Sequence, residues 1–75
     1  MDIENFETSD LPLTAFLVMK GLVLITARRV TNGKFLFVLQ DPDEIAHKLA
    51  LEYINSDFCK FDNNIRSIKK LIYTR

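Results

Sequence analysis

The dipeptide Asn32-Gly33 limits the possible folds of this chain more than any other feature. It lies between two runs of strand-forming residues, Leu22–Val30 and Phe35–Gln40, the first of them rich in branched side chains. A type I′ turn needs positive φ at both central residues, a conformation that Asn and Gly adopt readily. The sequence therefore predicts a β-hairpin with a two-residue loop.

The register of this predicted hairpin decides which residues share a face. A two-residue loop pairs Val30 with Phe35 and Arg28 with Phe37 on one face. Four aliphatic residues then lie together on the opposite face: Ile25, Ala27, Leu36 and Val38. A chain of 75 residues has little left to cover a second sheet face, and an exposed apolar face is typical of a partner site. We therefore predict a homo-oligomer, most simply a two-fold dimer, joined through this face or the open edge of the hairpin.

Residues 10–20 carry the start and stop signals of a short helix. Three neighbouring side chains can accept a hydrogen bond from its first turn: Thr8, Ser9 and Asp10. Pro12 suits the first turn, and Gly21 can take the left-handed conformation that closes a helix. The apolar residues between them lie on more than one side, which indicates a buried core helix.

The stretch "DPDEIAHKLALEYINS" predicts a second helix. We expect Asp41 to be its N-cap, Pro42 its first residue and Glu44 the partner in a capping-box-like pair. The helix should end near Asn55-Ser56. Its inward stripe should consist of Ile45, Leu49 and Tyr53, with Ala46 and Ala50 beside them.

The C-terminal quarter begins with "DFCKF", which predicts a connector or short strand. Asp62 should cap a last helix. Its inward residues should be Ile65, Ile68, Leu71 and Ile72, and its outward residues Arg66, Lys69 and Lys70.

These elements define one small α+β domain over residues 1–75, in which helices cover one face of a small antiparallel sheet. A short strand at Phe6-Glu7 can precede the first helix. We expect six residues to meet in one core: Phe16, Leu17, Phe35, Phe37, Leu49 and Ile68.

Bulk composition points to a soluble, intracellular protein. The apolar stretch Leu11–Ala27 is interrupted by Lys20 and Gly21, whereas a transmembrane helix needs about 20 predominantly apolar residues. The N-terminus is acidic where a secretory signal is basic. The single cysteine, Cys59, excludes a disulfide within the chain and favours a cytoplasmic location.

The chain also resembles a family of very small bacterial and phage proteins catalogued only as a domain of unknown function. The resemblance covers nearly the whole chain and depends on the opening "FETSDLPLTAFL", an aromatic strand leading to "DP", and the later "LEYINS" and "IKKLIY". The matching positions are Phe6, Thr8, Ser9, Asp10, Leu11, Phe16, Leu17, Gly21, Phe35, Phe37, Asp41 and Pro42. Thr14 precedes Ala15 where the family pattern has alanine first. The resemblance implies the same order of elements and a phage or mobile-element context, with a location in the host cytoplasm or the virion. It implies no activity.

Residues that could perform chemistry are few and scattered. His47 has Ala50 and Leu51 at the positions where a helical metal site needs a second ligand. Cys59 has no predicted base to make it a thiolate, so we interpret it as a buried small hydrophobe. The acidic cluster Asp41, Asp43 and Glu44 is explained by a helix start. The sequence therefore predicts no enzyme, no metal site and no cofactor.

Ten basic and ten acidic residues cancel, but the basic ones gather in two segments. One surrounds the hairpin and the other lies on the last helix; the candidate patch drawn from them comprises Arg28, Arg29, Lys34, Arg66, Lys69 and Lys70. Convergence of these segments would form a patch able to contact phosphates. Our first hypothesis is a homo-oligomeric interaction or assembly module, and the alternative is a small nucleic-acid-associated regulator that uses this patch.

Overall fold

The computed structural model describes residues 5–73, which form a three-stranded antiparallel sheet and three α-helices. The elements are β1 (Asn5–Thr8), α1 (Leu11–Met19), β2 (Val23–Arg29), the 3₁₀ turn η1 (Thr31–Gly33), β3 (Phe35–Gln40), α2 (Ala46–Ile54) and α3 (Asp57–Tyr73). The strand order is β1-β3-β2. The α+β class and the order βαββαα are as the sequence predicts, including the N-terminal strand.

The hairpin register differs from the predicted one by one residue. Arg29 pairs with Phe35 and Ala27 with Phe37, because the Val30 N–H donates to the Lys34 carbonyl and leaves three residues in the loop. Both Asn32 and Gly33 do have positive φ, at 69° and 75°. The turn chemistry was therefore predicted correctly, whereas the loop length was wrong.

A one-residue slip moves side chains to the other face of a sheet. Ala27 lies opposite Phe37, while Leu36 lies opposite Arg28 and Val38 opposite Thr26. Ile25 sits at an irregularity between Leu24 and Thr26. The four residues of the predicted oligomer face, Ile25, Ala27, Leu36 and Val38, consequently do not share one face.

Helix α1 has both of its predicted caps. Asp10 Oδ1 accepts the Leu13 N–H at 2.9 Å at the start. At the end, the Leu22 N–H donates to the Leu17 carbonyl and the Gly21 N–H to that of Val18, both at 3.0 Å. This pair of hydrogen bonds needs a residue in the left-handed conformation, and Gly21 is that residue, with a φ of 110°.

Helix α2 begins later than predicted. The segment after Asp41 first forms a turn, in which the Glu44 N–H donates to the Asp41 carbonyl and Glu44 itself has φ of 53°. The Asp41 side chain still accepts hydrogen bonds from a helix start, but from Ile45 and Ala46. The predicted capping box with Glu44 and the helical position of Pro42 were wrong, because the local signals for a helix start and for a turn are the same.

Helix α3 also has a different start. The residues predicted as a connector form its first turn, and Ser56 is its cap, since Ser56 Oγ accepts the Cys59 N–H at 3.3 Å. Asp62 lies inside the helix and pairs with Arg66 at 2.9 Å. The prediction that Asp62 begins the helix was wrong.

The core joins the sheet to the first two helices. Leu17, Leu22, Leu39 and Ala46 are buried together, with Phe6, Leu13, Phe37 and Leu49 packed against them. Of the six predicted core residues, Phe16 and Leu17 are buried and Phe37 and Leu49 are partly buried. Phe35 and Ile68 are 41% and 58% exposed, so their placement in the core was wrong.

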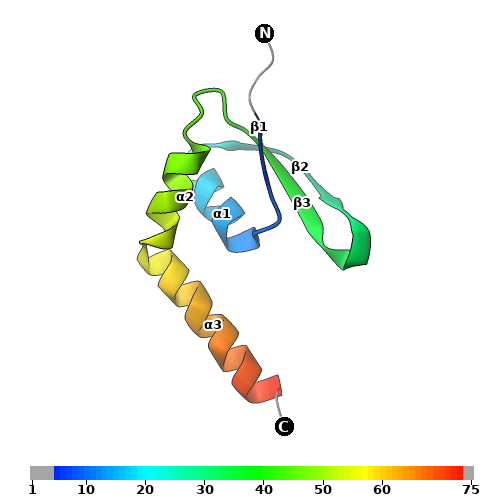
Figure 1. Ribbon diagram of the computed structural model, residues 1–75, viewed down its shortest axis with the longest axis vertical. Helices are drawn as coiled ribbons and strands as arrows, with labels where there is room; N and C mark the ends of the chain where they lie inside the picture. The colour runs from blue at the N-terminus through cyan, green and yellow to red at the C-terminus, as the bar shows by residue number, and fades with distance from the viewer. Residues whose placement is uncertain (1–4, 74–75) are drawn as a thin grey trace.

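The molecule is elongated, with extents of 53 × 30 × 14 Å. Figure 1 shows α1 between the sheet and an arm made of α2 and α3, and the C-terminal half of α3 extends past α1. Within residues 5–73, no helix is both long and apolar enough to cross a membrane.

Candidate functional site

An apolar groove lies between α1 and the first half of α3. It has a volume of about 260 Å³. Helix α1 lines it with Pro12, Ala15, Phe16 and Met19, helix α2 with Tyr53, and helix α3 with Phe58, Phe61, Asp62 and Ile65. This volume is below the range of about 300–1,000 Å³ that is typical of small-molecule pockets. The α1–α3 groove therefore suits inserted side chains better than a cofactor.

Three of the aromatic rings that line the groove lie close together. Phe16 of α1 lies 5.4 Å from the ring of Tyr53 in α2 and 5.7 Å from that of Phe58 in α3, both in tilted arrangements. Lys20, at the end of α1, connects this helix to α2, since its Nζ contacts Glu52 at 2.9 Å and lies 5.3 Å from the centre of the Phe16 ring. These contacts fix the positions of the three helices around the groove.

The break between α2 and α3 sets the direction of α3 along this groove. The Asn55 and Ser56 N–H groups donate to the carbonyls of Glu52 and Tyr53, and Ser56 Oγ donates to the Tyr53 carbonyl at 2.6 Å. Ser56 thus ends one helix and caps the next, so that the chain turns within two residues.

One side of α3 carries an apolar stripe that continues beyond the groove. The stripe consists of Phe58, Phe61, Ile65, Ile68 and Ile72, at alternating intervals of three and four residues. That spacing keeps side chains on one side of a helix and is the pattern of a helix–helix seam. None of the residues of α3 is buried, and Phe61, Ile68 and Ile72 are 68%, 58% and 60% exposed.

Charged residues lie along one edge of the stripe. Asp62 and Lys69 are seven residues apart, which is two helical turns, and both adjoin the stripe on the same side. Asp62 is paired with Arg66 and is only 22% exposed, whereas Lys60 pairs with Asp57 at 3.8 Å near the helix start.

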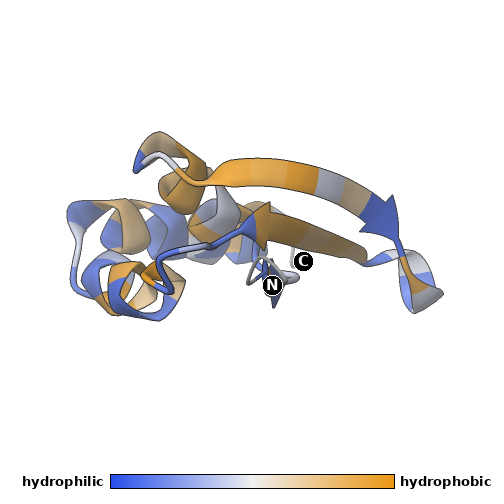
Figure 2. Ribbon diagram, turned by 90° about the horizontal axis from the view of Figure 1, so that it is seen from above, coloured by the Kyte–Doolittle hydropathy of each residue, from blue (hydrophilic) through white to orange (hydrophobic). Residues whose placement is uncertain are grey.

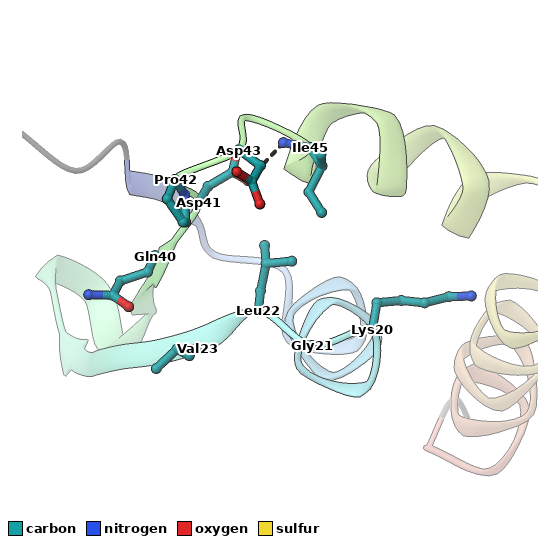
Figure 3. Close-up of a pocket in the computed structure, with 9 residues that line it drawn as sticks. All are labelled: Lys20, Gly21, Leu22, Val23, Gln40, Asp41, Pro42, Asp43 and Ile45. Carbon is teal, nitrogen blue, oxygen red and sulfur yellow. Dashed lines mark hydrogen bonds between the residues drawn. The ribbon is translucent and has the colours of Figure 1, made fainter.

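A second cavity, of about 170 Å³, lies where α1 leads into β2 and β3 leads toward α2. Figure 3 shows Asp41 at this cavity, bonded to the Ile45 nitrogen. Asp41 is 7% exposed, and its carboxylate already accepts the N–H groups of Ile45 and Ala46. Asp41 therefore serves the start of the helix.

The sequence-predicted oligomer residues are distributed over the hairpin. Ile25 is 48% exposed and Ala27 is exposed on β2, while Leu36 is half-buried and Val38 is buried on β3. Every residue of the edge strand β2 is exposed. Figure 2 shows that β2 is hydrophobic over its first half and hydrophilic beside the hairpin turn.

The sequence-predicted basic residues form two separate groups. Arg28, Arg29 and Lys34 lie at the hairpin end, where the Arg29 guanidinium lies 5.4 Å from the centre of the Phe35 ring. Arg66, Lys69 and Lys70 lie on α3, and Figures 1 and 2 both show this helix apart from the hairpin turn. The structure does not bring the two groups together in one patch.

His47 and Cys59 lie on different helices. His47 is exposed on α2, and Cys59 is half-buried on α3, where its sulfur accepts a 3.8 Å hydrogen bond from Asn63. Among residues 5–73, no group of three His, Cys, Asp or Glu side chains is close enough to hold a metal ion. Burial raises the pKa of the Tyr53 hydroxyl, and the nearby Cys59, Asp62 and Asp10 raise it further.

Sequence reasoning missed Met19, Phe58 and Phe61 as surface residues of interest. The three- and four-residue spacing from Phe58 to Ile72 was present in the sequence. Interpreting the first five residues of α3 as a connector hides this spacing.

The fold and the groove define a small α+β domain whose last helix carries an exposed apolar stripe. The model of one protein family, described as Domain of unknown function (DUF5659), matches residues 3–74. The chain therefore belongs to this family, as its resemblance to a small family of unknown function implied. The comparisons with curated proteins and with solved structures found no match.

Proposed function

We propose that this protein is a non-enzymatic interaction module that assembles with itself. The observation that supports this proposal best is the apolar stripe of α3, which stays exposed along the whole helix and runs into the α1–α3 groove. Exposed apolar patches of this kind mark interaction sites on small soluble domains. The chemistry of the groove supports binding and not catalysis, because hydrocarbon side chains line most of it and an active site needs several convergent polar groups.

The exposure of the second half of α3 also supports a partner. In proteins, most helical stability comes from packing an apolar face. The second half of α3, from Ile65 onward, has exposed side chains throughout. Its apolar residues therefore gain most from a contact with another molecule.

The size of the apolar stripe is adequate for self-association. Fully burying one such side chain contributes about 1.5–3 kcal/mol, so two copies of a half-exposed five-residue stripe contribute on the order of 10 kcal/mol. That gain offsets much of an association cost of about 4–15 kcal/mol. We therefore expect a monomer–dimer equilibrium that depends on protein concentration.

Sedimentation equilibrium between micromolar and millimolar concentrations tests this function. The wild type should dimerise, and Ile68→Lys should shift the equilibrium toward monomer without loss of helical circular dichroism. Ser67→Lys is the matched control, because it adds the same charge one position away and outside the stripe. A wild type that stays monomeric over the whole range would exclude self-assembly.

The family resemblance supports a proposal for the biological context of the module. We place it in a phage or mobile element, acting in the host cytoplasm or the virion. The genes beside family members test this placement: capsid, packaging or integration genes support it, and chromosomal housekeeping genes contradict it.

A further inference from the structure

We propose that two copies of the chain pair through α3 in antiparallel orientation, so that the second half of each α3 occupies the α1–α3 groove of the other copy. This inference depends on the proposed self-assembly and adds its geometry. The groove and the exposed half of the apolar stripe lie on the same side of one helix. A two-fold axis near the middle of α3 therefore brings each groove against the other copy's exposed half.

The intervals along α3 set the register of this pair. In an antiparallel helix pair, the apolar residues of one helix pack beside those of the other, and the three- and four-residue intervals run in opposite directions along the two helices. Placing Ile65 of one copy beside Ile68 of the other then sets Phe61 beside Ile72 of the other copy. Phe61 and Ile65 line the groove mouth, and Ile68 and Ile72 are the residues left exposed beyond it.

The charges on the edge of the stripe select this orientation. In the antiparallel register, Asp62 of each copy lies near Lys69 of the other copy, at two symmetry-related places. A parallel pair instead sets Asp62 of one copy near Asp57 of the other, which is a contact between like charges. Opposite charges facing each other across an interface favour the first arrangement.

The volume of the groove agrees with this occupant. About 260 Å³ lined by hydrocarbon is room for aliphatic side chains from a neighbouring helix and is smaller than a typical cofactor pocket. Asp62, at the rim of the groove, is already partly neutralised by Arg66 and remains able to accept a second cation.

Charge exchange on α3 tests the orientation with the full chain. The dimer dissociation constants of Asp62→Lys and Lys69→Asp should each rise by about tenfold or more, because each variant sets like charges together twice. An equimolar mixture of the two variants should form a heterodimer close to wild-type affinity, since both contacts are then between opposite charges. Lys70→Asp, which makes the same charge change off the stripe edge, should dimerise as the wild type does.

The outcomes separate this inference from the proposed function. A dimer that Asp62→Lys strengthens is parallel and overturns the inference, because that change relieves the contact with Asp57 in a parallel pair. A dimer that is indifferent to every α3 variant assembles through another surface, which overturns the inference and leaves self-assembly standing. A monomeric wild type overturns both.

Should Asp62→Lys fail to fold, spin labels decide the orientation. One label is placed at Ser67→Cys in a Cys59→Ala background, and it is compared with a label at the native Cys59. The antiparallel pair sets the two Ser67 labels level with each other along the axis and offsets the two Cys59 labels by roughly 20 Å, whereas a parallel pair sets the labels level at both positions.

Discussion

Asp41 holds the start of α2 from outside the helix. Its Oδ1 accepts the Ile45 N–H at 2.8 Å, four residues further along the chain, and the Ala46 N–H contacts both carboxylate oxygens at 3.1 Å. Asp41 is buried and Ala46 is fully buried, so the Ala46 N–H lies in a buried hydrogen bond, and the Ile45 N–H lies in a partly buried one. The turn between β3 and α2 therefore depends on one side chain.

This relationship predicts that Asp41→Ala destabilises the fold by about 1–3 kcal/mol, the cost of leaving buried donors without an acceptor. Asp41→Asn keeps one oxygen and should cost less. Urea unfolding followed by circular dichroism measures both. Asp43→Ala is the control, because Asp43 is exposed and its change should be nearly neutral. Equal losses from Asp41→Ala and Asp43→Ala would mean that the Asp41 bonds do not stabilise the turn.

Leu39 and Phe35 lie toward opposite ends of β3, and replacing each of them by alanine should lower the free energy of unfolding by different amounts. Leu39 is fully buried in the core, so Leu39→Ala should cost about 2–5 kcal/mol. Phe35→Ala should cost clearly less, because Phe35 is 41% exposed and stacks mainly on Phe37 and Arg29 at the hairpin end. Guanidinium unfolding at a protein concentration that keeps the chain monomeric measures the difference. If Phe35→Ala lowered the free energy of unfolding as much as Leu39→Ala does, the core would extend to the hairpin end.

Alkaline pH should weaken the fold through Tyr53. Burial raises the pKa of its hydroxyl above the ordinary value of 10.0, so the folded chain holds this proton more tightly than the unfolded chain does. The corresponding stabilisation is fully present below pH 10 and is lost as pH rises above that value and through the raised pKa. Urea midpoints at pH 8 and pH 10.5 should show a smaller loss for Tyr53→Phe than for the wild type.

Tyr73→Phe is the matched control for this measurement, because Tyr73 is 78% exposed. Its alkaline loss should equal that of the wild type, because the change removes a hydroxyl that the fold does not bury. An unchanged alkaline loss in Tyr53→Phe would show that Tyr53 is not the source of the effect.

Local signals along the chain were sufficient for the elements whose ends are fixed by their own neighbours. Asp10 and Gly21 bound α1 as expected, because a cap bonds N–H or carbonyl groups within the same turn. Asn32 and Gly33 likewise take the positive φ that their residue types favour. The α+β class follows from the order of such elements.

Tertiary contacts decided what those signals leave open. The sequence before α2 suits a helix start and a turn equally, and burial of Ala46 with Leu39 in the core sets the turn. The hairpin register depends on whether the loop has two or three residues, and this difference determines on which face of the sheet Ala27 lies. The exposure of α3 is the clearest case. A stripe of Phe58, Phe61, Ile65, Ile68 and Ile72 has the same spacing whether its own chain or a second copy covers it, because periodicity records that a face is apolar and not what packs on it. Only the path of α3 past α1 shows that, in residues 5–73, the second half of this stripe stays exposed.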